Sequence, residues 1–313
     1  MNAFTRFLVT LSLSALTASA AAGKSATPTG PVTLDAATRD SLTRALVQGR
    51  AETAEWLKSS PTSYFAAVQR VDFGNSNALT VGRAEDNSVR VDDPDMPEHA
   101  VLVVVEGDSF RVVASSPEGS FVAHKLEYRE AVLPPSAIQI GRWTVRLSHQ
   151  RFPALIVFDP KSPRYAEYHG QDWYPPDFSY RFEAPLTPNP KPDTTIIQST
   201  RGNLRRAVRV GWFDLKIRGK ACRLEAHRLL EPGVDEQSVS VFFRDATTGS
   251  ATYGVGRYVD PEKLPDGRWR IDFNDAYNPA CAFSPFYNCP IPSRANTLSV
   301  PIEAGEKDPH YEH

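Results

Sequence analysis

Sulfur is scarce in this sequence, which has three cysteines and two methionines in 313 residues. No CxxC pair or zinc-type spacing occurs, so neither a disulfide-rich scaffold nor a metal centre is indicated. Beyond the N-terminus, no apolar run approaches the roughly 20 residues that a membrane-spanning helix needs. Neither charge sign dominates, since 35 basic residues stand against 37 acidic ones, and this balance argues against a nucleic-acid partner.

Recognisable catalytic motifs are missing as well. There is no nucleophile elbow, phosphate-binding loop or HExxH helix, and the seven histidines are scattered. No cofactor is indicated. Proline is abundant, with 26 residues, and it fits poorly in helix interiors and central strands. We therefore predict many short elements that are joined by rigid turns.

The N-terminus has the pattern of an export signal. Arg6 precedes a short apolar run at 7–15, and small residues at 18–22 fit a cleavage site. This pattern predicts a cleaved signal peptide at 1–22 and a periplasmic or secreted mature chain; the alternative is a buried N-terminal helix. A small, polar linker is expected at 23–34.

The remaining chain is predicted to be mainly β, with two sandwich-like or barrel-like modules after one N-terminal helix. The helix spans 35–60, with Asp35 as N-cap and apolar residues at helical spacing. It either closes the edge of a sheet domain or binds a partner. Short alternating runs separated by turn signals then fill 61–150 and favour a β-sandwich.

The segment VGRAEDNSVRVDDPDMPEHA resembles the start of a forkhead-associated domain, a family whose arginine and serine hold phosphothreonine. Arg83 matches the family's arginine, whereas Met96 and Pro97 stand where its serine and second arginine belong. Phosphate recognition needs several converging donors. We therefore expect a degenerate forkhead-associated-like module in which Arg83 and His99 are structural.

Aromatic residues crowd into 165–182, including Trp173. They form either a platform for a sugar or another planar ligand, or a cover over the end of a barrel. Farther on, the runs FRDATTG, TYGVGRYV, DFNDAYNP, CPIP and AGEK are similar to those of DUF1684, a bacterial family of unknown function. This resemblance extends over roughly 140–307. It implies a mainly β domain at 151–307, followed by a tail at 308–313, and it implies no activity.

Polar and aromatic residues interleave within this second module and form a candidate ligand-binding site between 165–182 and the strands of 253–278. If the runs around Arg257 and Asp272 pair as strands, these two side chains lie together as a structural clamp or as the floor of an anion site. Asp272, Glu303 and Tyr277 are the alternative acid/base residues of a hydrolase. The candidate ligand-binding residues are Arg257, Asp272, Asn274, Tyr277, Asn278, Tyr253 and Trp173.

Cys281 and Cys289 lie eight residues apart in a proline-rich loop, and we predict that they form a disulfide in an exported protein. Cys222 lies in a strand-like run and is interpreted as a small buried hydrophobe. The sequence thus predicts an exported envelope protein that binds a small molecule or another envelope protein without catalysis. The alternatives are a hydrolase acting on a sugar or ester, and a purely structural protein.

Overall fold

The structure is a computed structural model, and it describes residues 27–311. The predicted signal peptide at 1–22 lies outside the described residues. One α-helix, α1 (Ala36–Ser59), begins where the Asp35 carboxylate accepts the Thr38 N–H at 2.8 Å. Most other elements are antiparallel strands, so the predicted mainly β fold with one N-terminal helix is confirmed. No helix in the described range is long and apolar enough to cross a bilayer.

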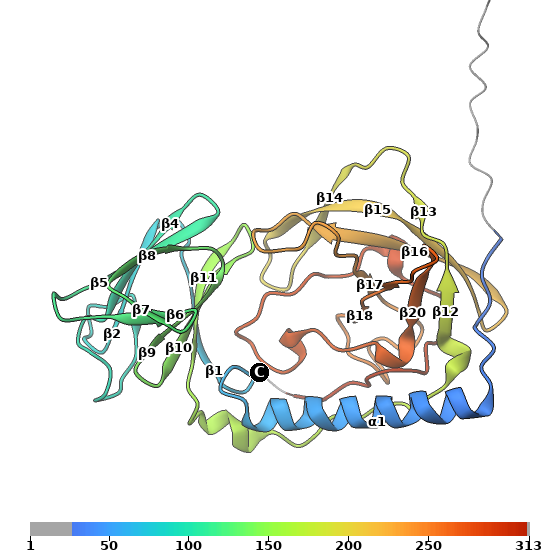
Figure 1. The fold of residues 1–313 in the computed structure, drawn as a ribbon, viewed down its shortest axis with the longest axis horizontal. Coiled ribbons are helices and arrows are strands. Elements are labelled where there is room, and N and C mark those ends of the chain that lie inside the picture. Colours follow the sequence, from blue (N-terminus) through green and yellow to red (C-terminus); the bar gives the residue numbers. More distant parts are fainter. Residues whose placement is uncertain (1–26, 312–313) are drawn as a thin grey trace, which may run out of the picture.

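The first module is a pair of packed sheets with a shared apolar core (Figure 1). One sheet has the order β3-β2-β4-β5-β8 and the other β1-β11-β10-β9-β6-β7. The strands are β1 (Ala67–Asp72), β2 (Ala78–Gly82), β3 (Val89–Arg90), β4 (Val101–Glu106), β5 (Ser109–Ala114), β6 (Phe121–Ala123), β7 (Leu126–Tyr128), β8 (Glu130–Leu133), β9 (Ser136–Ile140), β10 (Trp143–His149) and β11 (Pro153–Phe158).

The local structure explains why a glycine and then an arginine, Gly82 and Arg83, stand at the end of β2. A Cβ on Gly82 would lie 2.2 Å from the Glu98 carbonyl oxygen, so only glycine fits there. Arg83 then donates to the Met96 carbonyl and to the Glu98 carboxylate, both at 3.3 Å. His99 is half exposed and lies 3.8 Å from the Asp86 carboxylate. Arg83 therefore ties β2 to the loop that precedes β4.

The second module contains several small sheets around its own core. Its strands are β12 (Arg181–Ala184), β13 (Thr187–Pro188), β14 (Thr194–Gln198), β15 (Leu204–Ile217), β16 (Lys220–Leu229), β17 (Val241–Phe243), β18 (Arg257–Val259), β19 (Glu262–Lys263) and β20 (Trp269–Asp272). Five 3-10 helices complete it or precede it, namely η1 (Pro163–Glu167), η2 (Phe178–Tyr180), η3 (Phe273–Asp275), η4 (Ala280–Ala282) and η5 (Arg294–Asn296).

Strand pairing in this module differs from one expectation. β15 and β16 form a hairpin, with Ile217 opposite Lys220. However, β18 pairs with β17, and β20 pairs with β12 and β19. The two runs that carry Arg257 and Asp272 therefore do not pair with each other.

Helix α1 runs along one side of the second module and then leads into β1 of the first module (Figure 1). The chain before it is fastened to the second module, because the Thr29 N–H donates to the Asp214 carbonyl and the Val32 N–H to the Arg181 carbonyl, both at 2.9 Å. At its C-terminal end Leu57 is buried, the only residue of the helix that is. Contacts at both ends therefore fix the position of α1.

Candidate functional site

A cavity of about 580 Å³ lies between α1 and the second module. One wall is a single face of α1, because its lining residues recur at spacings of three and four. These residues are Leu42, Ala45, Leu46, Gly49, Arg50, Thr53 and Trp56. A Cβ built on Gly49 would meet nothing within 4 Å. At Gly49 the helix therefore borders open space, whereas Trp56 on the same face packs against the buried cluster that contains Phe65 and Phe283.

Arg50 crosses from the helix to the opposite wall. Its guanidinium donates to the Tyr174 carbonyl at 2.9 Å and the Asn274 carbonyl at 3.3 Å. It also stacks over Trp173, 4.7 Å from the ring centroid. Burial lowers the pKa of Arg50, while the carboxylates nearby, that of Asp275 first among them, act against this shift. Arg50 is therefore the central connection between α1 and the module beneath it.

The wall opposite the helix is polar, and part of it is a closed network. Asp272 is buried at the end of β20, forms an ion pair with Arg181 and accepts the Asn274 N–H at 3.0 Å and Nδ2 at 2.8 Å. The remaining Asn274 groups exchange hydrogen bonds with the Asp177 backbone at 2.8 and 3.0 Å. These residues shape the wall, and their polar groups are already paired.

Two other carboxyl groups border the cavity with raised pKa values. Burial raises the pKa of Glu306 to about 7, even though the Asn278 N–H and Gln171 Nε2 both donate to it at 2.7 Å. Burial and then the neighbouring Asp272 raise the pKa of Asp275 to about 6. Asp275 is accessible to solvent, yet protein surrounds it because it lies on a concave wall. Its carboxylate has no protein hydrogen bond within 27–311.

The polar wall also holds amide oxygens without partners. Asn278 is 2% exposed, and its Nδ2 donates to the Lys307 carbonyl at 2.6 Å. Its Oδ1 accepts no hydrogen bond from the described chain, and the same is true of Gln171 Oε1. Both oxygen atoms are fully buried, so they lie behind the cavity surface and out of reach of a ligand, and a buried polar atom without a partner costs about 1–3 kcal/mol.

The structure brings five of the seven candidate binding residues to this cavity. They are Trp173, Asp272, Asn274, Tyr277 and Asn278. Tyr253 lies elsewhere and donates to the Cys281 carbonyl at 3.2 Å. Arg257 also lies elsewhere, fully buried beneath the C-terminal segment.

The expected proximity of Arg257 and Asp272 is wrong, because their strands have other neighbours. Arg257 pairs with Asp245 at 2.9 Å, and Asp272 pairs with Arg181. The alternative in which Asp272 and Glu303 act together as acid/base residues is not supported either, because each pairs with another residue. Glu303 is on the surface and forms an ion pair with Arg218 at 2.7 Å. Tyr277 borders the cavity, and its hydroxyl donates to Asp260 at 2.8 Å.

Sequence reasoning missed the contribution of the helix and of Gln171. The signal for the helix was present, since Gly49 is unfavourable inside a helix by about 1 kcal/mol relative to alanine and lies on the apolar stripe. A glycine at such a position indicates that the helix surface is left free of a side chain there. No comparable signal marked Arg50, because an arginine on a helix is usually a solvated surface residue.

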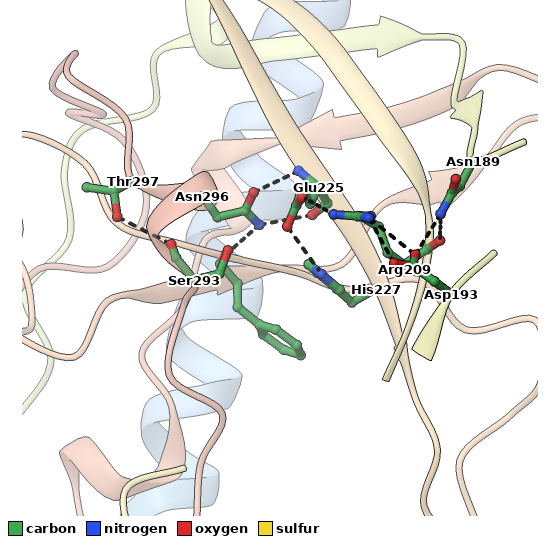
Figure 2. Close-up of polar contacts among 9 residues, drawn as sticks. Asn189, Asp193, Arg209, Glu225, His227, Ser293, Asn296 and Thr297 are labelled. Carbon is green, nitrogen blue, oxygen red and sulfur yellow. Dashed lines mark hydrogen bonds and ion pairs between the residues drawn. The ribbon is translucent and has the colours of Figure 1, made fainter. Parts of the chain in front are cut away.

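A second polar cluster lies on the β15–β16 hairpin, and Figure 2 shows that its members are paired with one another. Asn296 binds the Glu225 backbone at 2.7 and 2.9 Å, and the Glu225 carboxylate accepts from Arg209 at 2.8 Å. Arg209 also pairs with Asp193 at 3.1 Å. His227 is buried 3.5 Å from Glu225, and burial lowers its pKa. We interpret this cluster as a structural connection between the hairpin and the 293–297 turn.

The cysteine loop is adjacent to the cavity wall but separate from it. The Cys281 N–H donates to Cys289 Sγ at 3.3 Å, and both residues are buried. The structure contains no bond between the two sulfur atoms, so the disulfide stays a prediction. Cys222 is partly buried against the core of the second module, and burial raises the pKa of its thiol. Within the described residues, no group of three or more His, Cys, Asp or Glu could hold a metal ion.

Comparison with known proteins gave one family. Residues 166–307 match the model described as "Protein of unknown function (DUF1684)". The solution NMR structure of the uncharacterized protein from gene locus rrnAC0354 of Haloarcula marismortui is 32% identical, with a TM-score of 0.38; the match covers 48% of this chain and 82% of that one. The search among curated proteins gave no match.

A second solved structure is more distantly similar to this chain. The structure of Mycobacterium tuberculosis EmbR in complex with a low-affinity phosphopeptide is 16% identical, with a TM-score of 0.21. The match covers 40% of this chain and 32% of that one. At this level the likeness carries no argument about fold or ligand.

Proposed function

We propose that this chain, whose residues 166–307 belong to the DUF1684 family of unknown function, is an exported binding protein for a small organic molecule. The ligand occupies the cavity between α1 and the second module. The observation that carries this proposal is the contrast between the walls of this cavity. Gly49 faces open space on the helix side, and the exposed Asp275 carboxylate on the opposite wall has no hydrogen bond from the described residues.

Other observations support the same location. The volume of about 580 Å³ lies within the range of small-molecule sites, which are mostly apolar and carry a few placed polar groups. Trp56, Tyr64 and Trp173 supply aromatic contact area at its border. Export rests on the signal-like residues at 1–22, and the periplasm or the exterior is where we expect the ligand to be encountered.

Native mass spectrometry of protein purified from a periplasm tests this proposal. Gly49→Leu places a large side chain in the open space. Gly49→Ala is the matched control, because alanine and leucine have similar helix propensities and alanine leaves most of that space free. We expect a co-purifying species of defined mass in the wild type and in Gly49→Ala, and its loss in Gly49→Leu. Equal retention of that species by Gly49→Leu would place the ligand elsewhere, and an empty wild type would count against a tightly held ligand.

Hydrolysis is a second candidate function, favoured by the two raised carboxyl pKa values at one cavity. Asp275 would accept a proton from the attacking water, and protonated Glu306 would give one to the leaving oxygen of a glycoside or an ester. Asp275→Asn would then abolish turnover while the substrate still binds. Glycoside and ester panels with no turnover above that of the Asp275→Asn variant would exclude this candidate.

A further inference from the structure

Carboxyl groups outnumber arginines around the cavity. The charged residues that line it are Arg50, Arg181, Arg270, Glu262, Asp272, Asp275 and Glu306. Two of the arginines are neutralised in ion pairs, Arg181 with Asp272 and Arg270 with Glu262 at 2.6 Å. A single arginine, Arg50, is left to balance the two carboxyl groups that remain. The cavity therefore carries an excess negative charge whenever both of these groups are ionised.

Asp275 carries the carboxyl group that a ligand can reach. Asp275 is exposed on the concave wall, whereas Glu306 is 2% exposed and lies behind the surface. Within residues 27–311 no group donates a hydrogen bond to the Asp275 carboxylate, because Arg50 donates to the carbonyls of Tyr174 and Asn274 instead. The pKa of Asp275 is about 6, so the group is mostly ionised at neutral pH.

An ammonium group is the natural counterpart of such a carboxylate. A carboxylate only accepts hydrogen bonds and an ammonium group only donates them, so the pair forms short, charge-assisted bonds. The concave wall around Asp275 excludes part of the solvent, and a lower effective dielectric strengthens the attraction between opposite charges.

The face of α1 around Gly49 requires an apolar body on the same molecule. Leu42, Ala45 and Leu46 line the cavity there, all three keep exposed surface, and none belongs to a buried cluster of residues 27–311. Thr53 adds no free donor, because its hydroxyl donates to the Gly49 carbonyl at 2.9 Å. Covering apolar surface is favourable in proportion to the area removed from water.

We infer that the ligand is a small organic amine, whose ammonium group binds the Asp275 carboxylate and whose apolar body covers the Gly49 face of α1. This inference rests on the proposed function and deepens it. The ammonium charge offsets the excess negative charge of the cavity, whereas an anionic ligand would add to that excess. A neutral ligand of the same shape would cover the helix and leave Asp275 without a counter-charge.

Ligand-observed NMR with three probes of matched shape tests this class. Phenethylamine, phenylethanol and phenylpropionate share one apolar body and are cationic, neutral and anionic at neutral pH. With the full mature chain, saturation-transfer titrations should show that phenethylamine binds about tenfold more tightly than either of the other two, which is the contribution expected of one charge-assisted hydrogen bond.

Three variants locate the bound amine. Asp275→Asn keeps the size of the side chain and removes its charge, so it should abolish the preference for phenethylamine over phenylethanol. Glu303→Gln is the matched control, because it removes an exposed carboxylate that does not line the cavity, and it should keep the preference. Gly49→Leu fills the open space and should weaken the binding of all three probes.

Each unfavourable result contradicts a different part of the inference. Tighter binding of phenylethanol or phenylpropionate would overturn the amine class. A preference for phenethylamine that survives in Asp275→Asn would overturn the role of Asp275, and binding that persists in Gly49→Leu would place the amine outside the cavity. No transfer to any probe would overturn the class of apolar amines, while the mass of a co-purified species still tests the proposed function separately.

Discussion

Arg257 allows the sharpest prediction about stability. Its guanidinium is fully buried and donates four hydrogen bonds, to the Asp245 carboxylate at 2.9 Å and to the carbonyls of Ile302, Ala304 and Glu306 at 2.8, 2.5 and 3.0 Å. Arg257→Met would keep much of the volume but leave the buried Asp245 Oδ2 atom and three carbonyls without this donor. Breaking a buried ion pair from one side costs about 3–5 kcal/mol.

Urea unfolding, followed by tryptophan fluorescence, measures this loss. With a denaturant slope of about 2 kcal/mol per molar, the midpoint of the second module should fall by about 2 M. Arg218→Met is the matched control, because Arg218 forms a single ion pair with Glu303 and both side chains are half exposed. Such a pair contributes about 0–1 kcal/mol. If Arg257→Met lowers the free energy of unfolding by less than about 1 kcal/mol, the claim that the buried Arg257–Asp245 ion pair stabilises this module is refuted.

Three further predictions follow from buried polar groups. Because the pKa of Glu306 is raised to about 7 from 4.5, the folded state keeps a proton that the unfolded chain releases. The free energy of unfolding should therefore fall by about 3 kcal/mol between pH 4.5 and 7, and Glu306→Gln should flatten this slope in urea titrations. Asn296→Ala should cost about 2 kcal/mol in the same assay, since three backbone groups lose their partner. For Cys281 and Cys289, an intact mass about two units lower before reduction than after would support the disulfide, which would add about 2.5 kcal/mol; two free thiols in periplasmic protein would contradict it.

Local structure was predictable where its cause is local. Asp35 caps α1 as expected, because an N-cap carboxylate acts on the backbone N–H groups of its own first turn. The turn of the β15–β16 hairpin also has a local cause, because Arg218 and Gly219 adopt positive φ angles of 49° and 81°, and two-residue turns of this kind favour glycine. Regular alternation likewise indicated most strands of the first module.

The candidate site was only partly predictable, because its assembly depends on pairing over long sequence distances. Asp272 meets Arg181, 91 positions earlier, and the Asn274 carbonyl meets Arg50, 224 positions earlier. Nothing in the runs around Arg257 and Asp272 indicates that other strands lie beside them. Composition indicated the polar and aromatic character of the site, and the fold decided which of these side chains face the cavity.

A crystal structure of the mature protein purified from a periplasm tests the central claim most directly. We predict non-protein electron density between Gly49 and Asp275, within hydrogen-bonding distance of the Asp275 carboxylate. The Gly49→Leu protein, crystallised in the same way, should show the leucine side chain in that space and no such density. A cavity closed by packing of Leu46 onto the Asp275 wall, or ligand density at another place on the protein, would contradict the account.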